Sequence, residues 1–210
     1  MQKHKLLAHS SWLIVIALIV LAGCMKREIK NVNSNGKNII CFGDSITYGY
    51  GVKPEEGFCP ILSKMVTMPV INAGIDGDTS TEALRRFKAD VLDRQPYLVI
   101  IEFGGNDFLR KTPMEVTVSN IQQMVSAAQE QGAIVAIADI SAGLFLREYR
   151  VALSKLAAKN NAIFIPSILS KIITNPALKS DFMHPNSEGY KIVASKIHRY
   201  IKPYLKNNNF

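Results

Sequence analysis

Short and almost purely apolar runs recur along this chain and separate longer segments with a helical pattern. Three of these runs, at 98–101, 134–137 and 163–165, contain only Leu, Val, Ile, Ala and Phe. A strand with one solvated face alternates apolar and polar residues, so a continuous apolar run indicates a strand buried on both faces. With two further runs, the sequence predicts five strands, at 38–42, 70–73, 97–103, 134–140 and 162–165.

The segments between the strands have helical spacing. Thr79 and Glu82 form a potential capping box at the start of one helix, and Gly132 is a stop signal for the next. Strictly alternating strands and helices predict an α/β fold, with a five-stranded parallel sheet inside a three-layer αβα sandwich. A chain of 210 residues is long enough for one such domain. We expect helices at 57–67, 79–93, 116–131, 146–160 and 187–200.

The first residues have the pattern of an export signal. Lys3 and Lys5 precede eleven consecutive apolar residues at 12–22. This run is shorter than the roughly 20 residues of a membrane-spanning helix and is typical of a secretory signal peptide, although a membrane anchor is the alternative.

At the end of this run, Leu21-Ala22-Gly23-Cys24 resembles a bacterial lipobox, in which the cysteine thiol is diacylated and the cysteine becomes the mature N-terminus. The alternative is a chance cysteine beside a cleavage site. We expect a lipoprotein signal peptide at 1–23 and a flexible polar tether at 24–37, followed by one domain at 38–206. The protein would then be exported and held to a bacterial membrane in the cell envelope by lipid on Cys24.

Charge and cysteine content narrow the possible partners. Removing 1–23, which holds Lys3 and Lys5 but no acidic residue, leaves +6 of the formal net charge of +8. The positive residues are dispersed, so we expect a solvated basic surface and no nucleic-acid partner. We also expect a monomer. Export would place the protein in a compartment that permits a disulfide between Cys41 and Cys59. Cys41 lies in a predicted buried strand, however, where a free thiol packs well. A disulfide and two free thiols are therefore both open.

Polar residues follow the predicted strands and suggest one site. Ser45, Gly74 and Asn106 come after the first three strands, and Asp181 and His184 lie in a loop after the fifth. In parallel sheets ligands bind beyond the carboxyl ends of the strands, where such residues converge. A serine attacks an acyl carbon well when a base takes its proton and a carboxylate orients that base. We therefore expect Ser45 as the nucleophile, His184 as the base and Asp181 as its orienting group.

Acyl transfer also needs donors for the oxygen that becomes negatively charged. The candidates are the backbone N–H of Gly74, the side-chain amide of Asn106 and the N–H of Ser45 itself. Each such donor contributes about 3 to 4 kcal/mol in comparable sites. Thr47 stands where the Gly-x-Ser-x-Gly elbow of α/β-hydrolases has its second glycine, so the sequence requires another serine-hydrolase frame.

Taken together, these residues resemble the sequence blocks of the SGNH, or GDSL-type, hydrolases. The matching segments are Gly43-Asp44-Ser45-Ile46, Gly74, Gly104-Gly105-Asn106-Asp107 and Asp181-Phe182-Met183-His184. The resemblance extends over about 39–190 and is closest to the bacterial thioesterase, lysophospholipase and arylesterase subgroup.

This resemblance implies a flavodoxin-like fold, no metal, no cofactor, and the roles given above for Ser45, Asp181, His184, Gly74 and Asn106. The expected substrate is a small acyl ester or lipid. Residues 139–144 lack the proline expected from the closest subgroup. The choice between thioester, lysophospholipid, aryl ester and acetylated carbohydrate therefore stays open.

Two alternative functions also have to be considered. Asp44, Asp78, Asp107 and Asp181 suggest a metal-dependent phosphohydrolase, which would give Ser45 no role. A surface lipoprotein that keeps the fold only for binding is the second alternative. Around the site, three apolar residues are either acyl-pocket or packing residues: Phe108, Leu144 and Phe145.

Overall fold

The computed structural model describes residues 28–143 and 146–206, so the expected signal peptide and Cys24 lie outside the described residues. Its centre is a five-stranded parallel sheet with strand order β2-β1-β3-β4-β5. The expected α/β class and five-stranded parallel sheet are confirmed. The strands are β1 (Asn38–Gly43), β2 (Val70–Gly74), β3 (Pro96–Glu102), β4 (Ile134–Ala138) and β5 (Ile163–Ile165).

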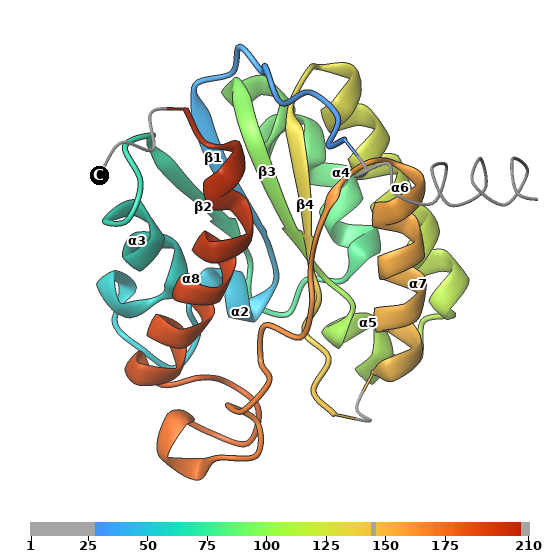
Figure 1. Cartoon of the computed structure of the whole chain (residues 1–210). Helices are drawn as coiled ribbons and strands as arrows, with labels where there is room; N and C mark the ends of the chain where they lie inside the picture. Colours follow the sequence, from blue (N-terminus) through green and yellow to red (C-terminus); the bar gives the residue numbers. More distant parts are fainter. Residues whose placement is uncertain (1–27, 144–145, 207–210) are drawn as a thin grey trace, which may run out of the picture.

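Helices cover both faces of the sheet, which completes the three layers (Figure 1). On one face, α3 (Phe58–Ser63) and α8 (Ser187–Ile201) pack on alternate strand residues such as Ile39 and Leu98. On the other, α4 (Ser80–Asp90), α6 (Met114–Glu130) and α7 (Arg147–Lys159) pack on the residues between them, such as Ile40 and Val99. Burial of both faces explains why the strands are continuously apolar.

Two short helices were not among the five helix ranges expected from the sequence. They are α2 (Ser45–Tyr48), directly after β1, and α5 (Gly105–Leu109), two residues after β3. Four or five residues are too few for an apolar period to be read. Single turns of 3₁₀-helix complete the described elements: η1 (Pro54–Glu56), η2 (Leu92–Arg94), η3 (Pro176–Leu178) and η4 (Lys202–Tyr204).

The capping box at the start of α4 is confirmed. Thr79 donates its backbone N–H to Glu82 Oε2 at 2.8 Å, and its hydroxyl oxygen accepts the Glu82 N–H at 3.4 Å. The helix ends at Asp90, three residues earlier than expected from the pattern, because the chain turns through η2 before β3.

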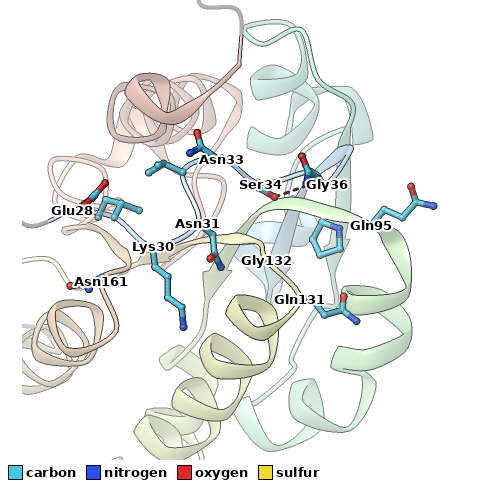
Figure 2. A pocket seen from close by; sticks show the side chains of 14 residues that line it. Glu28, Lys30, Asn31, Asn33, Ser34, Gly36, Gln95, Gln131, Gly132 and Asn161 are labelled. Carbon is cyan, nitrogen blue, oxygen red and sulfur yellow. Dashed lines mark hydrogen bonds between the residues drawn. The ribbon is translucent and has the colours of Figure 1, made fainter.

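Residues 28–37 differ from the flexible tether expected at 24–37. The backbone N–H of Lys30 donates to Asn161 O at 2.9 Å, and Asn31 Nδ2 donates to the carbonyls of Gln129 and Ala133 at 2.8 and 3.0 Å. Ser34 is buried. The segment thus lies across the amino-terminal edge of the sheet, beside an open polar cavity of about 710 Å³ (Figure 2). Asn31 thus satisfies two carbonyls of the domain, and Ser34 Oγ accepts the Gly36 N–H at 3.3 Å. Composition alone does not distinguish these roles from those of a linker.

Both cysteines of the domain are buried free thiols. Cys41 lies on β1, and Cys59 Sγ in α3 donates to the carbonyl of Thr47 at 3.4 Å. Within 28–143 and 146–206, no helix is both long and apolar enough to cross a bilayer.

Candidate active site

Most of the residues expected to form the site lie at the carboxyl ends of the strands. Ser45 begins α2 immediately after β1, and Asn106 lies in α5 after β3. Asp181 and His184 belong to the loop between η3 and α8, at the same end of the sheet as α2 and α5 (Figure 1). Ser45, Asn106 and His184 line one cavity.

Ser45, His184 and Asp181 form a continuous hydrogen-bonded chain. His184 Nε2 lies 3.0 Å from Ser45 Oγ, and His184 Nδ1 lies 2.7 Å from Asp181 Oδ2. The carboxylate accepts only, so it assigns the imidazole proton to Nδ1 and leaves the Nε2 lone pair for the serine hydroxyl. The serine is therefore placed beside a base in the tautomer that can take its proton.

The loop that carries the histidine is held by its own aspartate. Asp181 Oδ1 accepts the backbone N–H groups of Met183 and His184 at 2.8 and 2.9 Å. Burial acts to raise the pKa of Asp181, but these backbone hydrogen bonds and the His184 ring outweigh it and hold the pKa at about 2. The carboxylate is thus ionised at neutral pH. The ring of Tyr50 packs on the His184 ring, with centroids 4.5 Å apart.

The start of α2 leaves a backbone donor beside the nucleophile. Asp44 caps the helix, and its Oδ1 accepts the N–H of Ile46 at 3.1 Å. The N–H of Ser45 itself has no acceptor among the described residues. An N–H at a helix start is suited to an anionic oxygen.

Asn106 is fixed by two acceptors on different segments. Its Nδ2 donates to Asp44 Oδ2 at 3.2 Å and to the carbonyl of Asp78 at 3.0 Å. These contacts tie α5 to the end of β1 and to the turn after β2. The amide sits in the same cavity as the Ser45 hydroxyl.

The structure places Gly74 away from this cavity, which corrects the expectation that its N–H faces the oxyanion. That N–H donates to Asn72 Oδ1 at 2.9 Å. A Cβ at Gly74 would lie 2.3 Å from the backbone N of Tyr48, so the glycine permits close packing of β2 against α2.

Gly77 is the donor that the sequence reasoning missed. It has φ +79° in the turn between β2 and α4, and its N–H has no acceptor among the described residues. The next residue, Asp78, is the one whose carbonyl accepts from Asn106. A usable signal was present, because Asp76-Gly77 is a turn dipeptide directly before the α4 capping box.

The cavity beside Ser45 is small and largely apolar. Its volume is about 60 Å³, well below the roughly 300 to 1,000 Å³ of a typical ligand pocket. Phe108 is not among its lining residues and packs instead on Tyr149, while Leu144 and Phe145 lie outside the described residues. The apolar walls are Ile46, Leu109, Ile140, Leu169, Ile173 and Met183.

The four aspartates that suggested a metal site have separate protein partners. Asp44 and Asp181 hold the backbone and side-chain donors described above, and Asp78 pairs with Arg86 at 2.6 Å. Asp107 accepts from Ser80 Oγ at 2.6 Å and from Thr117 Oγ1 at 3.0 Å. In the part of the chain that the structure describes, no three His, Cys, Asp or Glu residues are grouped as metal ligands.

Several known proteins are similar to this chain in sequence and fold. Esterase TesA of Pseudomonas aeruginosa is 25% identical over 198 residues, covering 89% of this chain and 98% of that protein. The thioesterase 1/protease 1/lysophospholipase L1 of Escherichia coli is 28% identical over 181 residues, covering 81% and 86%. The structure of the psychrotrophic esterase EstA from Pseudoalteromonas, inhibited by monoethylphosphonate, superposes with a TM-score of 0.73 at 27% identity, covering 81% of this chain and all of that one.

Two further matches are to a lipoprotein and to a family model. An uncharacterized lipoprotein of Bacillus subtilis, YqeF, is 35% identical over 102 residues, which is 45% of this chain and 39% of that protein. The model of the GDSL-like lipase/acylhydrolase family matches residues 41–192, which include every residue of the site described above. The chain therefore belongs to the GDSL-like lipase/acylhydrolase family and is a serine ester hydrolase.

Proposed function

We propose that Ser45, His184 and Asp181 are the catalytic triad of this esterase and that the reaction passes through an acyl-enzyme on Ser45. The observation that carries the proposal is the unbroken hydrogen-bonded chain from Asp181 Oδ2 through the imidazole to Ser45 Oγ. A nucleophile, its base and the orienting group of that base are the parts that acyl transfer requires.

The two half-reactions follow from this geometry. Ser45 Oγ attacks the carbonyl carbon while its proton passes to His184 Nε2, and the ionised Asp181 stabilises the imidazolium. Collapse of the tetrahedral intermediate expels the alcohol or thiol, which takes that proton. A water molecule then attacks the acyl-enzyme with His184 as base, releasing the acid and restoring Ser45.

The oxyanion of the intermediate would be held by three donors: the N–H of Ser45, the N–H of Gly77 and Asn106 Nδ2. The first two have no acceptor among the described residues. Asn106 Nδ2 donates its two hydrogens to Asp44 and Asp78, so one of these would turn from its acceptor to the oxyanion. Backbone donors fixed before the reaction stabilise the developing charge without reorganisation.

Replacing Asn106 with alanine should lower kcat by about 10² to 10³-fold with a small change in KM, because the donor acts mainly on the transition state. The measurement is steady-state hydrolysis of p-nitrophenyl esters. Asn33→Ala, an exposed asparagine at the opposite edge of the sheet, is the matched control and should retain wild-type kcat. An Asn106→Ala enzyme with more than about one third of the wild-type kcat would remove Asn106 from the oxyanion site.

The small cavity supports esters with a short acyl group. A volume of about 60 Å³ is several times the roughly 10 to 15 Å³ that one water needs on the same measure, so it suits an acyl group of a few carbons. Longer chains would have to lie along the exposed side chains of Leu109 and Met183 at the rim.

The small volume of the cavity also favours a second candidate function, an O-acetylesterase acting on carbohydrate or cell-wall polymer. Comparing kcat/KM for p-nitrophenyl esters from acetyl to palmitoyl, and for acetylated xylan, distinguishes the two.

The membrane anchor is likewise a proposal, with lipid on Cys24 as the attachment. Its support is the lipobox-like segment that ends at Cys24 and the partial similarity to a lipoprotein.

The place where residues 28–37 are bound would set the orientation of an anchored enzyme. These residues lie at the amino-terminal edge of the sheet, and the active site lies at the carboxyl edge. The six residues of β1 separate the two edges by about 20 Å. The four chain steps from Cys24 to residue 28 reach at most about 14 Å. An anchored enzyme would therefore turn its active site away from its own membrane.

The acylated full chain in liposomes should hydrolyse soluble p-nitrophenyl esters normally and lysophospholipid of its own bilayer poorly. Inserting about 30 Gly/Ser residues between Lys26 and Arg27 adds a reach of about 30 Å and should raise the lysophospholipid rate at least several-fold. The soluble-ester rate is the internal control. Equal lysophospholipid rates for the two forms would contradict the orientation.

A further inference from the structure

Two carboxyl groups are buried together directly behind the nucleophile. Glu102 is the last residue of β3 and pairs in register with Gly43, the residue before Asp44. Glu102 is 0% exposed and Asp44 is 2% exposed. Neither carboxyl group is in an ion pair within the described ranges 28–143 and 146–206. Two such groups cannot both be ionised at this spacing without a large cost.

The hydrogen bonds around the pair are complete except at one atom. Glu102 Oε2 accepts from Thr47 Oγ1 at 2.7 Å. Of the buried side-chain oxygen and nitrogen atoms in the described residues, Glu102 Oε1 is the one without a partner. The carboxyl groups of Glu102 and Asp44 each shift the pKa of the other, so a proton on Glu102 Oε1, shared with Asp44, would give this oxygen the partner it lacks.

The surroundings of the two carboxyl groups favour the protonated form of one of them. Burial is the largest cause that raises the pKa of Asp44, to about 7, and it also raises the pKa of Glu102 well above its ordinary value. One cation, Arg86, packs on this strand end; it donates to the carbonyl of Gly43 and pairs with Asp78 and Asp90. The other titratable groups that act on the pair or respond to it are Asp76, Asp107, Cys59 and Tyr190.

We propose that Glu102 is protonated in the folded enzyme and donates a hydrogen bond to Asp44. The Asp44 carboxylate then stays an acceptor that positions Asn106. Asp44 accepts the Ile46 N–H in the first turn of α2 and Asn106 Nδ2, and in this proposal the Glu102 carboxyl is its third donor. Glu102 is a positioning residue that acts through Asp44 on both the nucleophile's helix and the oxyanion amide. Its effect on rate rests on the proposed role of Asn106.

A pair of variants separates hydrogen bonding from charge. Glu102→Gln keeps an N–H donor for Asp44 and an oxygen for Thr47, so kcat should stay within about three-fold of wild type. Glu102→Leu has similar bulk and no hydrogen bond, and kcat should fall at least about 10-fold with little change in KM, because a misplaced oxyanion donor acts on the transition state. Equal losses in the two variants would overturn the proposal.

The pH profile and the infrared spectrum test the proton itself. At alkaline pH the shared proton is lost, two carboxylates face each other, and wild-type kcat should decline; Glu102→Gln has no such proton and should lack this decline. The infrared carbonyl band of a protonated carboxylic acid should be present in wild type near neutral pH and absent in Glu102→Gln. This band does not depend on activity, so it separates failure of this proposal from failure of the triad. A spectrum in which the substitution removes no such band would overturn the shared proton.

Discussion

Ser45→Ala is expected to lower kcat for p-nitrophenyl acetate by about four to six orders of magnitude, to a residual rate that the oxyanion donors alone support. The serine supplies the atom that forms the acyl-enzyme, and no other hydroxyl is hydrogen-bonded to His184 Nε2 in the described part of the chain. The loss should appear in kcat and in kcat/KM, with no burst of p-nitrophenol.

The same substitution should leave the fold intact. Asp44, not Ser45, is the N-cap of α2, and alanine is well tolerated at the first helical position. Thermal unfolding of Ser45→Ala should therefore match wild type within a few degrees. The matched control is Ser63→Ala in α3, an exposed serine, which should retain full activity. Full turnover by Ser45→Ala would refute the nucleophile assignment.

His184→Ala should be about as inactive as Ser45→Ala, and the double variant should be no slower than either single variant. The two side chains act as a unit, since the serine is a weak nucleophile once its base is gone. The measurement is a double-variant cycle on kcat, and strict additivity of the two losses would contradict the shared step.

His198→Ala is the control for this cycle because His198 is the other histidine in the described residues and lies on α8, away from the cavity. It should keep wild-type kcat. His184→Ala also removes the ring contact with Tyr50 and the hydrogen bond to Asp181, so we expect a modest fall in the melting temperature of that variant. A fall in activity with His198→Ala equal to that with His184→Ala would point to a general loss of fold.

The sheet was predictable because each strand is apolar along its whole length. All five strands were located, since runs such as 98–101 and 134–137 are buried on both faces and carry no competing pattern. The residues after those strands were predictable as a group for a related reason, because parallel strands bring their carboxyl ends to one edge. The structure brings Ser45, Asp181 and His184 into hydrogen-bond distance.

Other features depend on contacts between residues far apart in the sequence. Gly74 was expected to be a donor because it follows a predicted strand, and only the structure shows that Asn72 Oδ1 accepts its N–H. Residues 28–37 have the composition of a linker, but Asn31 reaches carbonyls about a hundred residues away. Glu102 ends an apolar run, and the sequence does not show that it lies near a second buried carboxyl group, that of Asp44 after β1.

Covalent labelling with a p-nitrophenyl alkylphosphonate tests the central proposal most directly. Phosphonylation of a serine nucleophile mimics the tetrahedral intermediate and needs both the serine and its base. One phosphonyl group per molecule should appear on the peptide that contains Ser45, at the rate at which esterase activity is lost, and Ser45→Ala and His184→Ala should remain unlabelled. Stoichiometric label on another residue, or undiminished turnover by a protein fully labelled at Ser45, would contradict the assignment of Ser45 as the nucleophile.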